Sequence, residues 1–141
     1  MVYWILIGTN DLGSGCSAEI VLVGILRVIE ELLLKQPQSV IVINGILPRS
    51  TIAANGYLLY NHSFWKDIAS INQALEQYTQ HRSKQLHYFD ARDLFLVDAS
   101  VKDESQLQIQ LDLMPDLLHP SALGYQKWGE AIVEKLKTIL K

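Results

Sequence analysis

Two continuous apolar runs, separated by a long helical pattern, constrain the fold of this chain more than any other feature. They cover Val2–Ile7 and Ser39–Asn44, and each has strand length and is rich in β-favouring residues. A run that is apolar at successive positions is typical of a strand buried on both faces, as in a parallel sheet. Parallel neighbours need a crossover, and Ala18–Lys35 supplies one of helical length. The sequence therefore predicts an α/β fold built on a right-handed strand–helix–strand unit.

The crossover helix carries its own start signal. Ser17 is predicted as its N-cap, and Glu19 lies in the first turn, where an acidic side chain complements the helix dipole. The second half of the helix is amphipathic. The first half, from Ile20 to Leu26, is apolar all round, which predicts cover on more than one side.

A further helix and strand follow. Thr51–His62 has a loop-like composition, and the residues from Ser63 to about Arg82 are predicted as a helix of the third layer. Leu86–Phe89 is predicted as a short third strand that ends at Asp90. The apolar face of the predicted helix carries Ile68, Ile71, Leu75 and Tyr78.

The last third of the chain is irregular until a closing helix. Ala91–Leu113 has a poor pattern, with one short turn predicted at Asp93–Phe95. A helix is predicted from about Ala122 to Leu140. The side chains that it is expected to bury are Trp128, Ile132, Leu136 and Ile139.

Length and charge narrow the function classes. A chain of 141 residues is predicted as a single domain spanning residues 1–141. Its net charge of −3, with no basic run, argues against nucleic acid or an anionic membrane as partner. The single Cys16 excludes an intrachain disulfide, and His62, His81 and His87 show no metal-ligand spacing, so we expect no metal ion and no cofactor. No apolar run can span a bilayer and no signal-peptide pattern opens the sequence, so we expect a cytoplasmic location.

An Asp and a His three positions apart form the first candidate site. Asp116 and His119 lie in a turn between Pro115 and Pro120, and Ser121 is placed to cap the helix that follows. A carboxylate that accepts from one ring nitrogen fixes the tautomer and leaves the other nitrogen free as a base. The alternative interpretation is a helix-capping turn with an exposed histidine, and this stretch alone does not separate the two.

The loop after the first strand is the second candidate site. Gly8-Thr9-Asn10-Asp11 is predicted as a turn at the carboxyl end of that strand, where open α/β sheets bind ligands. The Asn10 amide can donate to a developing oxyanion, and Asp11 can hold the loop by accepting from backbone amides. An ordinary turn is the alternative. Farther along, Arg49 can meet an acidic group of a substrate, although an exposed loop arginine is the favoured interpretation.

Together these segments resemble one family. Gly8–Asp11, Leu47-Pro48-Arg49 and Asp116–Pro120, in this order, are similar to the second half of an SGNH (GDSL-type) esterase, most of all its platelet-activating-factor acetylhydrolase-like branch. The resemblance implies a flavodoxin-like three-layer α/β/α domain, here lacking its amino-terminal strands, that hydrolyses small carboxylic esters.

The resemblance also implies roles for individual residues. Asn10 would be the oxyanion donor, His119 the general base and Asp116 the residue that orients it, while Gly8, Thr9 and Asp11 would form the supporting loop. The commonest family form has glycine where Leu117 stands, so a positive φ there would strain the leucine.

The family's nucleophile block, a Gly-Asp-Ser after a strand, does not occur in this sequence. The serines at positions 14, 17, 50 and 121 show no sign of activation. Two function classes therefore stay open: an ester hydrolase whose nucleophile lies outside this chain, and a non-catalytic remnant that acts as an interaction or folding module. A small-anion binder ranks last, because no Gly-rich phosphate loop is present.

Without a preceding strand, Val2–Ile7 would lie at a sheet edge. That edge has no proline or lysine to block pairing, so we expect self-association through this strand and little esterase activity from the chain alone.

Overall fold

The structure is a computed structural model that describes residues 1–50, 56 and 64–141. The chain divides into two compact units. Unit one comprises Met1–Ile46 and Lys66–Asp90, and unit two comprises Leu47–Trp65 and Ala91–Lys141. Each unit is described by itself. The predicted loop Thr51–His62 lies, apart from Gly56, outside the described residues.

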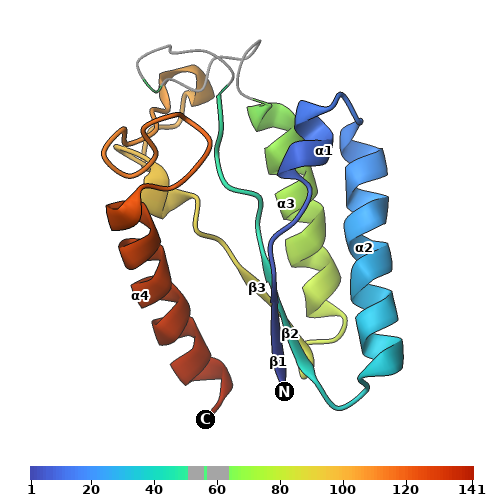
Figure 1. Cartoon of the computed structure of the whole chain (residues 1–141). Helices are drawn as coiled ribbons and strands as arrows, with labels where there is room; N and C mark the ends of the chain where they lie inside the picture. The colour runs from blue at the N-terminus through green and yellow to red at the C-terminus, as the bar shows by residue number, and fades with distance from the viewer. Residues whose placement is uncertain (51–55, 57–63) are drawn as a thin grey trace. The chain divides into compact units, whose positions relative to one another are not determined.

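Unit one is built on a parallel sheet, as predicted. Its strands β1 (Val2–Ile5), β2 (Val40–Asn44) and β3 (Leu86–Phe89) run in the order β1-β2-β3. In the register, Val2 lies opposite Val40 and Ile41 opposite Leu86. The β-favouring runs therefore pair in parallel, and helices connect consecutive strands (Figure 1).

The prediction that Val2–Ile7 is buried on both faces is wrong. β1 ends at Ile5 and is half-buried at all four positions, whereas Ile41, Val42 and Ile43 of β2 are buried. The physical reason is position, since β1 is an edge of the described sheet and β2 lies between two neighbours. An apolar run marks a strand but does not tell whether both of its sides are occupied.

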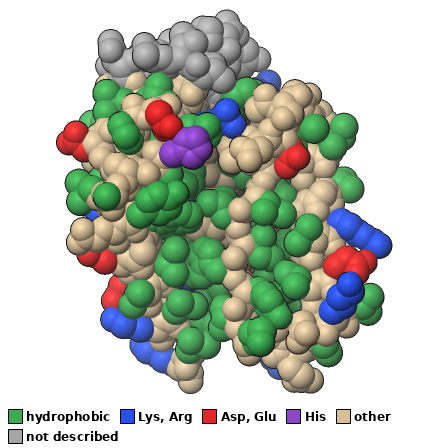
Figure 2. All heavy atoms as spheres, in the orientation of Figure 1, with side chains coloured by type: hydrophobic (Ala, Val, Ile, Leu, Met, Phe, Trp, Pro, Cys, Tyr) green, Lys and Arg blue, Asp and Glu red, His purple; other side chains and the backbone are tan. Residues whose placement is uncertain are grey.

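Helix α2 (Ala18–Lys35) has the predicted bounds, and the Ser17 side chain accepts a hydrogen bond from the backbone N–H of Ile20, as expected of an N-cap. Its buried positions form a single stripe, so the predicted all-round cover is absent among the described residues: Ile20 and Val23 are 63% and 66% exposed. Arg27, Glu31 and Lys35 form ion pairs on the surface of α2. On the face of the molecule shown in Figure 2, apolar side chains lie at the surface on both sides of a charged group. The buried stripe consists of Val21, Ile25, Ile29 and Leu33.

Helix α3 (Trp65–Gln80) buries Ile68, Ile71 and Leu75, as predicted, while Tyr78 is half-buried and donates its hydroxyl proton to Glu30. The expected place in a third layer is wrong within unit one, because α2 and α3 cover the same face of the sheet (Figure 1). The strands are parallel and added in one direction, so two crossovers of the same hand leave their helices on one side.

The end of β2 is fixed by one buried side chain. The amide of Asn72, on α3, accepts from the Ile46 N–H at 2.7 Å and donates to the Ile46 carbonyl at 3.0 Å. It thereby takes the place of a strand partner after the ladder ends, so both polar groups of this buried peptide stay paired.

Unit two is irregular apart from its closing helix. It contains the short 3₁₀ turns η1 (Asp93–Phe95) and η2 (Glu104–Gln106), and helix α4 (Ala122–Ile139). The turn at Asp93–Phe95 confirms the prediction, whereas η2 and an antiparallel bridge between Leu96 and Ile109 were not predicted. The core of the unit is formed by Phe95, Leu96, Leu107, Ile109, Leu113 and Met114.

Helix α4 is less buried than predicted. Trp128, Ile132, Leu136 and Ile139 are all half-buried, and Gly124 is the buried residue of the helix. Trp128 packs edge-on against Phe95, with ring centroids 6.4 Å apart, which anchors the helix to η1. None of the helices in the described part of the chain is both long and apolar enough to cross a membrane.

Replacing Asn72 with leucine should leave the Ile46 N–H and carbonyl unpaired in the interior. Each buried polar group without a partner costs about 1–3 kcal/mol, so we expect the free energy of unfolding to fall by about 2–4 kcal/mol. Urea denaturation measures it. The control is Gln73→Leu, an exposed position on the same helix, which should shift stability by less than about 0.5 kcal/mol. Equal effects of the two variants would contradict the assigned role of Asn72.

Candidate active site

Asp116 and His119 form a hydrogen-bonded pair in unit two. The Asp116 Oδ2 lies 2.6 Å from the His119 Nδ1, as the spacing predicted. The other carboxylate oxygen, Oδ1, accepts from the backbone N–H groups of Leu118 at 2.9 Å and His119 at 2.6 Å. The carboxylate is therefore held from two sides, and its orientation toward the ring is fixed.

These hydrogen bonds stabilise the ionised form of Asp116. Those from the His119 backbone N–H and ring are the largest cause, and they hold the pKa of Asp116 at about 2. At neutral pH the side chain is thus an acceptor for the Nδ1 proton. The lone pair of the neutral imidazole then lies on Nε2, and 71% of the His119 side chain is exposed.

The loop that carries this pair is closed at its base by Ser121. The Ser121 N–H donates to the Leu113 carbonyl at 2.8 Å, and the Ser121 hydroxyl donates to the Asp112 carbonyl at 2.6 Å. The same hydroxyl accepts from the Gly124 N–H at 3.1 Å, which confirms the predicted cap of α4. Capping turn and Asp–His pair are therefore both present, and the loop ends are tied to the start of a helix.

Leu117, between the paired residues, has a φ of +63°. The left-handed conformation expected from the glycine of the family is therefore adopted by a leucine, and such a conformation strains a residue that carries a Cβ. The Leu117 carbonyl accepts from the Ser50 N–H at 3.0 Å. This contact between residues far apart in the sequence could not be predicted, because no local pattern encodes it.

The segment Gly8–Asp11 lies in unit one and is not the turn that was predicted. Gly8 adopts a left-handed conformation, with a φ of +110°, and Thr9–Gly13 form the short helix α1. The Leu12 N–H donates to the Gly8 carbonyl at 3.1 Å and closes the first helical turn. A Cβ at Gly8 would lie 2.8 Å from a Val21 methyl group, so the glycine is needed both for its φ and for its size.

Within this segment Thr9 is half-buried, and Asn10 and Asp11 are exposed. Asp11 contributes its main-chain carbonyl, which accepts from Ser14 at 3.2 Å and from Cys16 at 3.0 Å. The predicted side-chain contacts of Asp11 with backbone amides are not seen among the described residues. The roles that the resemblance implies for Asn10 and His119 would require the two side chains to face one another. That arrangement stays a prediction, since the two residues belong to different units.

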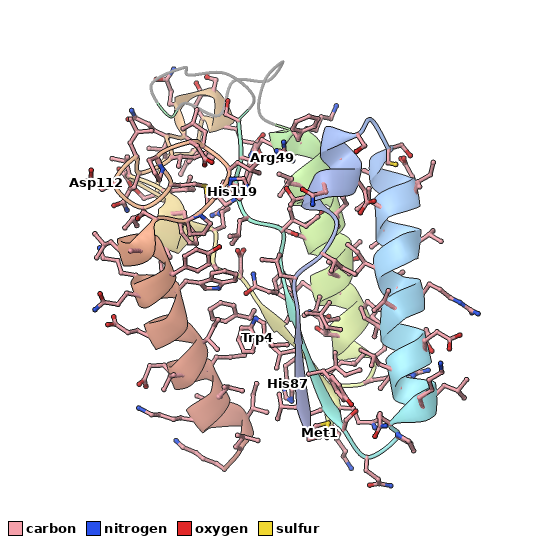
Figure 3. The ribbon with its side chains drawn as sticks, in the orientation of Figure 1. Met1, Trp4, Arg49, His87, Asp112 and His119 are labelled. Carbon is pink, nitrogen blue, oxygen red and sulfur yellow. The ribbon has the colours of Figure 1, made fainter. Side chains whose placement is uncertain are left out.

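Arg49 is not the exposed loop arginine that the sequence favoured. It is only 9% exposed, and its guanidinium lies 4.9 Å from the centroid of the Phe64 ring (Figure 3). Burial lowers the pKa of Arg49. The residues after β2 thus pack into unit two, where the next residue, Ser50, bonds to Leu117.

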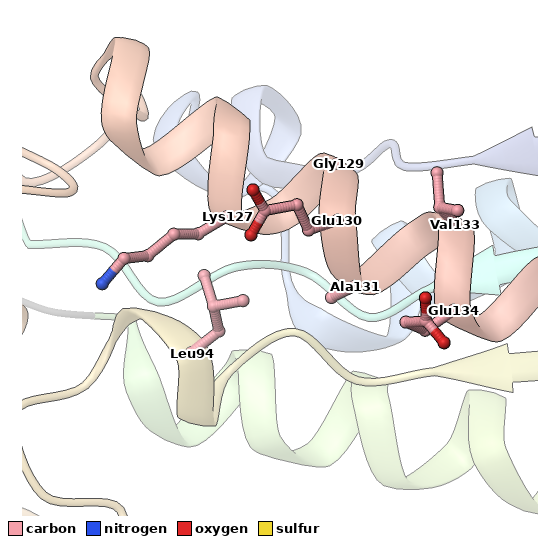
Figure 4. A pocket seen from close by; sticks show the side chains of 7 residues that line it. All are labelled: Leu94, Lys127, Gly129, Glu130, Ala131, Val133 and Glu134. Atoms are coloured by element: carbon pink, nitrogen blue, oxygen red, sulfur yellow. The ribbon is translucent and has the colours of Figure 1, made fainter.

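Two of the hollows in the described parts of the chain lie in different units. One, of about 730 Å³, runs along α4 beside Leu94 (Figure 4). Its polar lining comes from Lys127, Glu130 and Glu134, and neither Asp116 nor His119 reaches it, so it is not the candidate site. The other, of about 300 Å³, adjoins Gly8 and Asp11 in unit one and is mainly apolar. Its remaining lining residues are Ile7, Cys16, Ile20, Val21, Gly24, Ile25 and Val28.

In the described residues, no group of three or more His, Cys, Asp or Glu side chains is placed to hold a metal ion. His62 lies outside the described residues. The features described above are an imidazole oriented by a carboxylate in unit two and the segment Gly8–Asp11 in unit one.

The model of the GDSL-like lipase/acylhydrolase family matches residues 2–127. The chain belongs to this family. No curated protein matches the chain. The assignment agrees with the order of the three sequence segments from which the resemblance was drawn.

Solved structures share the α/β fold of the chain. A protein from Streptococcus pneumonia, provisionally described as a platelet activating factor, is 24% identical, with a TM-score of 0.74 over 96% of this chain and 59% of its own. A provisionally assigned acylhydrolase from Bacteroides fragilis is 17% identical, with a TM-score of 0.73 over 99% of this chain and 62% of its own. The esterase domain of the zebrafish ZfL2-1 retrotransposon ORF1 protein is 22% identical, with a TM-score of 0.61 over 94% and 70%. The chain thus spans about 60% of the length of the two bacterial proteins.

Gly124 brings the start of α4 against the base of the Asp116–His119 loop. A Cβ on it would lie 2.3 Å from the Leu113 carbonyl oxygen, which already accepts from Ser121. We expect Gly124→Ala to lower the free energy of unfolding by about 1–3 kcal/mol, because a backbone carbonyl must move. On the same helix a Cβ on Gly129 meets nothing within 4 Å, so Gly129→Ala should raise stability by up to about 1 kcal/mol. Thermal or urea unfolding gives both values, and shifts of the same sign would contradict the packing argument.

Proposed function

We propose that this chain contributes the general base and the oxyanion donor of an ester hydrolase. The observation that carries the proposal is the Asp116–His119 pair, 2.6 Å apart, in a chain that belongs to the GDSL-like lipase/acylhydrolase family. The pair leaves Nε2 exposed, as a base that must reach a nucleophile requires. The nucleophilic serine is proposed to lie outside residues 1–141, because the sequence contains no Gly-Asp-Ser.

In the proposed reaction the serine Oγ attacks the ester carbonyl carbon while His119 Nε2 takes the hydroxyl proton. The carbonyl oxygen becomes an oxyanion and accepts a hydrogen bond from the Asn10 amide. When the C–O bond to the leaving group breaks, His119 returns the proton to the departing alcohol. Water then adds to the acyl-serine with the same base, which releases the carboxylic acid and restores the serine.

Asp116 serves this cycle by charge and by position. Each time His119 accepts a proton it becomes an imidazolium, and an ionised carboxylate at Nδ1 stabilises that charge. The low pKa of Asp116 keeps the carboxylate ionised throughout the pH range of such a reaction. Gly8, Thr9 and Asp11 are proposed to support the Asn10 loop, with Gly8 setting its direction.

The platelet-activating-factor acetylhydrolase-like branch is the proposed place of the chain within the family, with small esters as substrates. Two observations support it: the order and spacing of the three sequence segments, and the similar fold of the Streptococcus pneumonia protein that is provisionally described as a platelet activating factor.

The isolated chain should hydrolyse a short-chain aryl ester at most weakly and should not be labelled by a fluorophosphonate probe. In a protease with a complete triad, loss of the nucleophile lowers kcat by roughly a million-fold. Where the coding sequence adds an in-frame strand ending in Gly-Asp-Ser, the protein that contains both parts should be active. In that protein His119→Ala should lower kcat/KM by on the order of 10⁴–10⁶.

The matched control is His81→Ala, an exposed histidine after α3, which should leave the rate unchanged. Stoichiometric labelling of the isolated chain, lost in His119→Ala, would place the nucleophile within residues 1–141. An active longer protein that tolerates His119→Ala would contradict the assignment of the base.

A second candidate function, an association module, is favoured by the open edge of the sheet. The Met1 carbonyl accepts from the Val40 N–H. In a parallel ladder with this register, the backbone N–H and carbonyl groups of Val2 and Trp4 point away from β2. Next to the end of β1, Ile7 and Ile20 are 40% and 63% exposed and line one apolar hollow. A strand edge without a partner, beside exposed apolar side chains, favours pairing with another chain.

In sedimentation velocity at micromolar concentration the chain should self-associate through Val2–Ile7 and the adjacent apolar surface. Ile20→Glu should shift the equilibrium toward monomer, because association would bury the new charge. Leu34→Glu is the control, since Leu34 is 77% exposed on the same helix but does not line the hollow. A native chain that is monomeric and unfolds cooperatively would contradict this second function.

A further inference from the structure

Two described non-glycine residues of unit two, Phe64 and Leu117, have a left-handed backbone, and Leu117 lies between the two members of the candidate catalytic pair. Leu117 has a φ of +63°, which L-residues rarely adopt and which a glycine would adopt without strain. Such strain persists only where surrounding contacts determine the conformation, and it gathers at functional sites.

Three contacts hold Leu117 in this conformation. Its side chain is buried, at 5% exposure, so the backbone at residue 117 cannot leave the left-handed conformation without exposing that side chain. Its N–H donates to the Met114 carbonyl at 3.0 Å, and its carbonyl accepts from the Ser50 N–H at 3.0 Å. The peptide groups on both sides of Leu117 are thus fixed, one of them by a segment 67 residues earlier in the sequence.

The left-handed turn aligns the groups that orient the histidine. With Leu117 in this conformation, the next two N–H groups, those of Leu118 and His119, both point at the Asp116 Oδ1. Oδ2 is then left for the His119 Nδ1. A more extended Leu117 would carry these donors away from the carboxylate and lengthen the tether between carboxylate and ring.

We propose that Leu117 and Ser50 are positioning residues: the buried Leu117 side chain and the Ser50 N–H keep residue 117 left-handed, and this conformation sets the geometry of the Asp116–His119 pair. The importance of that geometry for catalysis rests on the proposed function, whereas the geometry itself does not. A glycine would adopt this φ without strain, whereas the leucine is held there by its buried side chain and its backbone hydrogen bonds.

The ionisation of Asp116 reports on this geometry without any substrate. Its pKa of about 2 arises from the hydrogen bonds that the turn aligns, so loosening the turn should return the carboxyl toward its ordinary 3.8. Since a depressed pKa stabilises the fold above the ordinary value, that contribution is lost as the pH falls from about 4 to about 2. The measurement is an NMR titration of the Asp116 carboxyl carbon between these limits.

Four variants make the test specific. Leu117→Ala keeps the strained φ but loses the anchor, so its Asp116 pKa should rise clearly toward 3.8, while Leu117→Gly tolerates the φ and should rise less. Leu107→Ala removes the same atoms from another buried site of the unit, at 3% exposure, and should leave the Asp116 pKa at about 2. Ser50→Pro removes the N–H donor and should raise the pKa.

The control for the last change is Ser50→Ala, which keeps the N–H and should leave the pKa unchanged. An Asp116 pKa that stays at about 2 in both Leu117→Ala and Ser50→Pro would overturn the proposal, as would an equal rise in Leu107→Ala. If Leu117→Ala does not fold, Leu117→Gly and Ser50→Pro decide the question. Because the readout needs no turnover, a failure of the esterase proposal would leave it unaffected.

Discussion

The parallel pairing of β2 with both of its neighbours is the constraint on which unit one depends. In the described sheet β1 and β3 each bond to β2 alone, so the register of the whole sheet is set along one strand of five residues. Parallel pairing in turn requires the crossovers that α2 and α3 provide, and burial of their apolar stripes against the sheet stabilises both layers. Where the ladder stops, Asn72 pairs the next peptide, so the chain leaves β2 along a fixed path.

Unit two has little regular structure, and specific polar contacts take the place of a ladder. Ser121 ties both ends of the Asp116–His119 loop together, and Gly124 leaves room for the Leu113 carbonyl at the helix start. A loop closed in this way loses little entropy when it orients a side chain, because its conformations are already few. The exposed imidazole is therefore carried by a loop whose ends are tied together.

The family assignment and the geometry of the pair address different questions. The match over residues 2–127 shows membership of the GDSL-like lipase/acylhydrolase family, and the 2.6 Å contact shows that the Asp116 carboxylate orients the His119 ring. An oriented base has no catalytic consequence until a nucleophile meets it. The open edge of β1 and the exposed Ile20 side chain are among the features of unit one that lack cover in the described residues.

The sequence by itself determined the three strands, the bounds and cap of α2, the cap of α4 and the Asp116–His119 pair. All of these depend on local signals: apolar runs, a serine before a helix, and two residues three positions apart. The family resemblance, which has glycine at position 117, also indicated that a positive φ there would strain the leucine. Only the tertiary structure decided that β1 is no more than half-buried, that Arg49 is buried and that Ser50 bonds to Leu117. These features depend on which distant segments meet, and neither periodicity nor capping chemistry encodes the partner of a strand edge, a loop arginine or a backbone N–H.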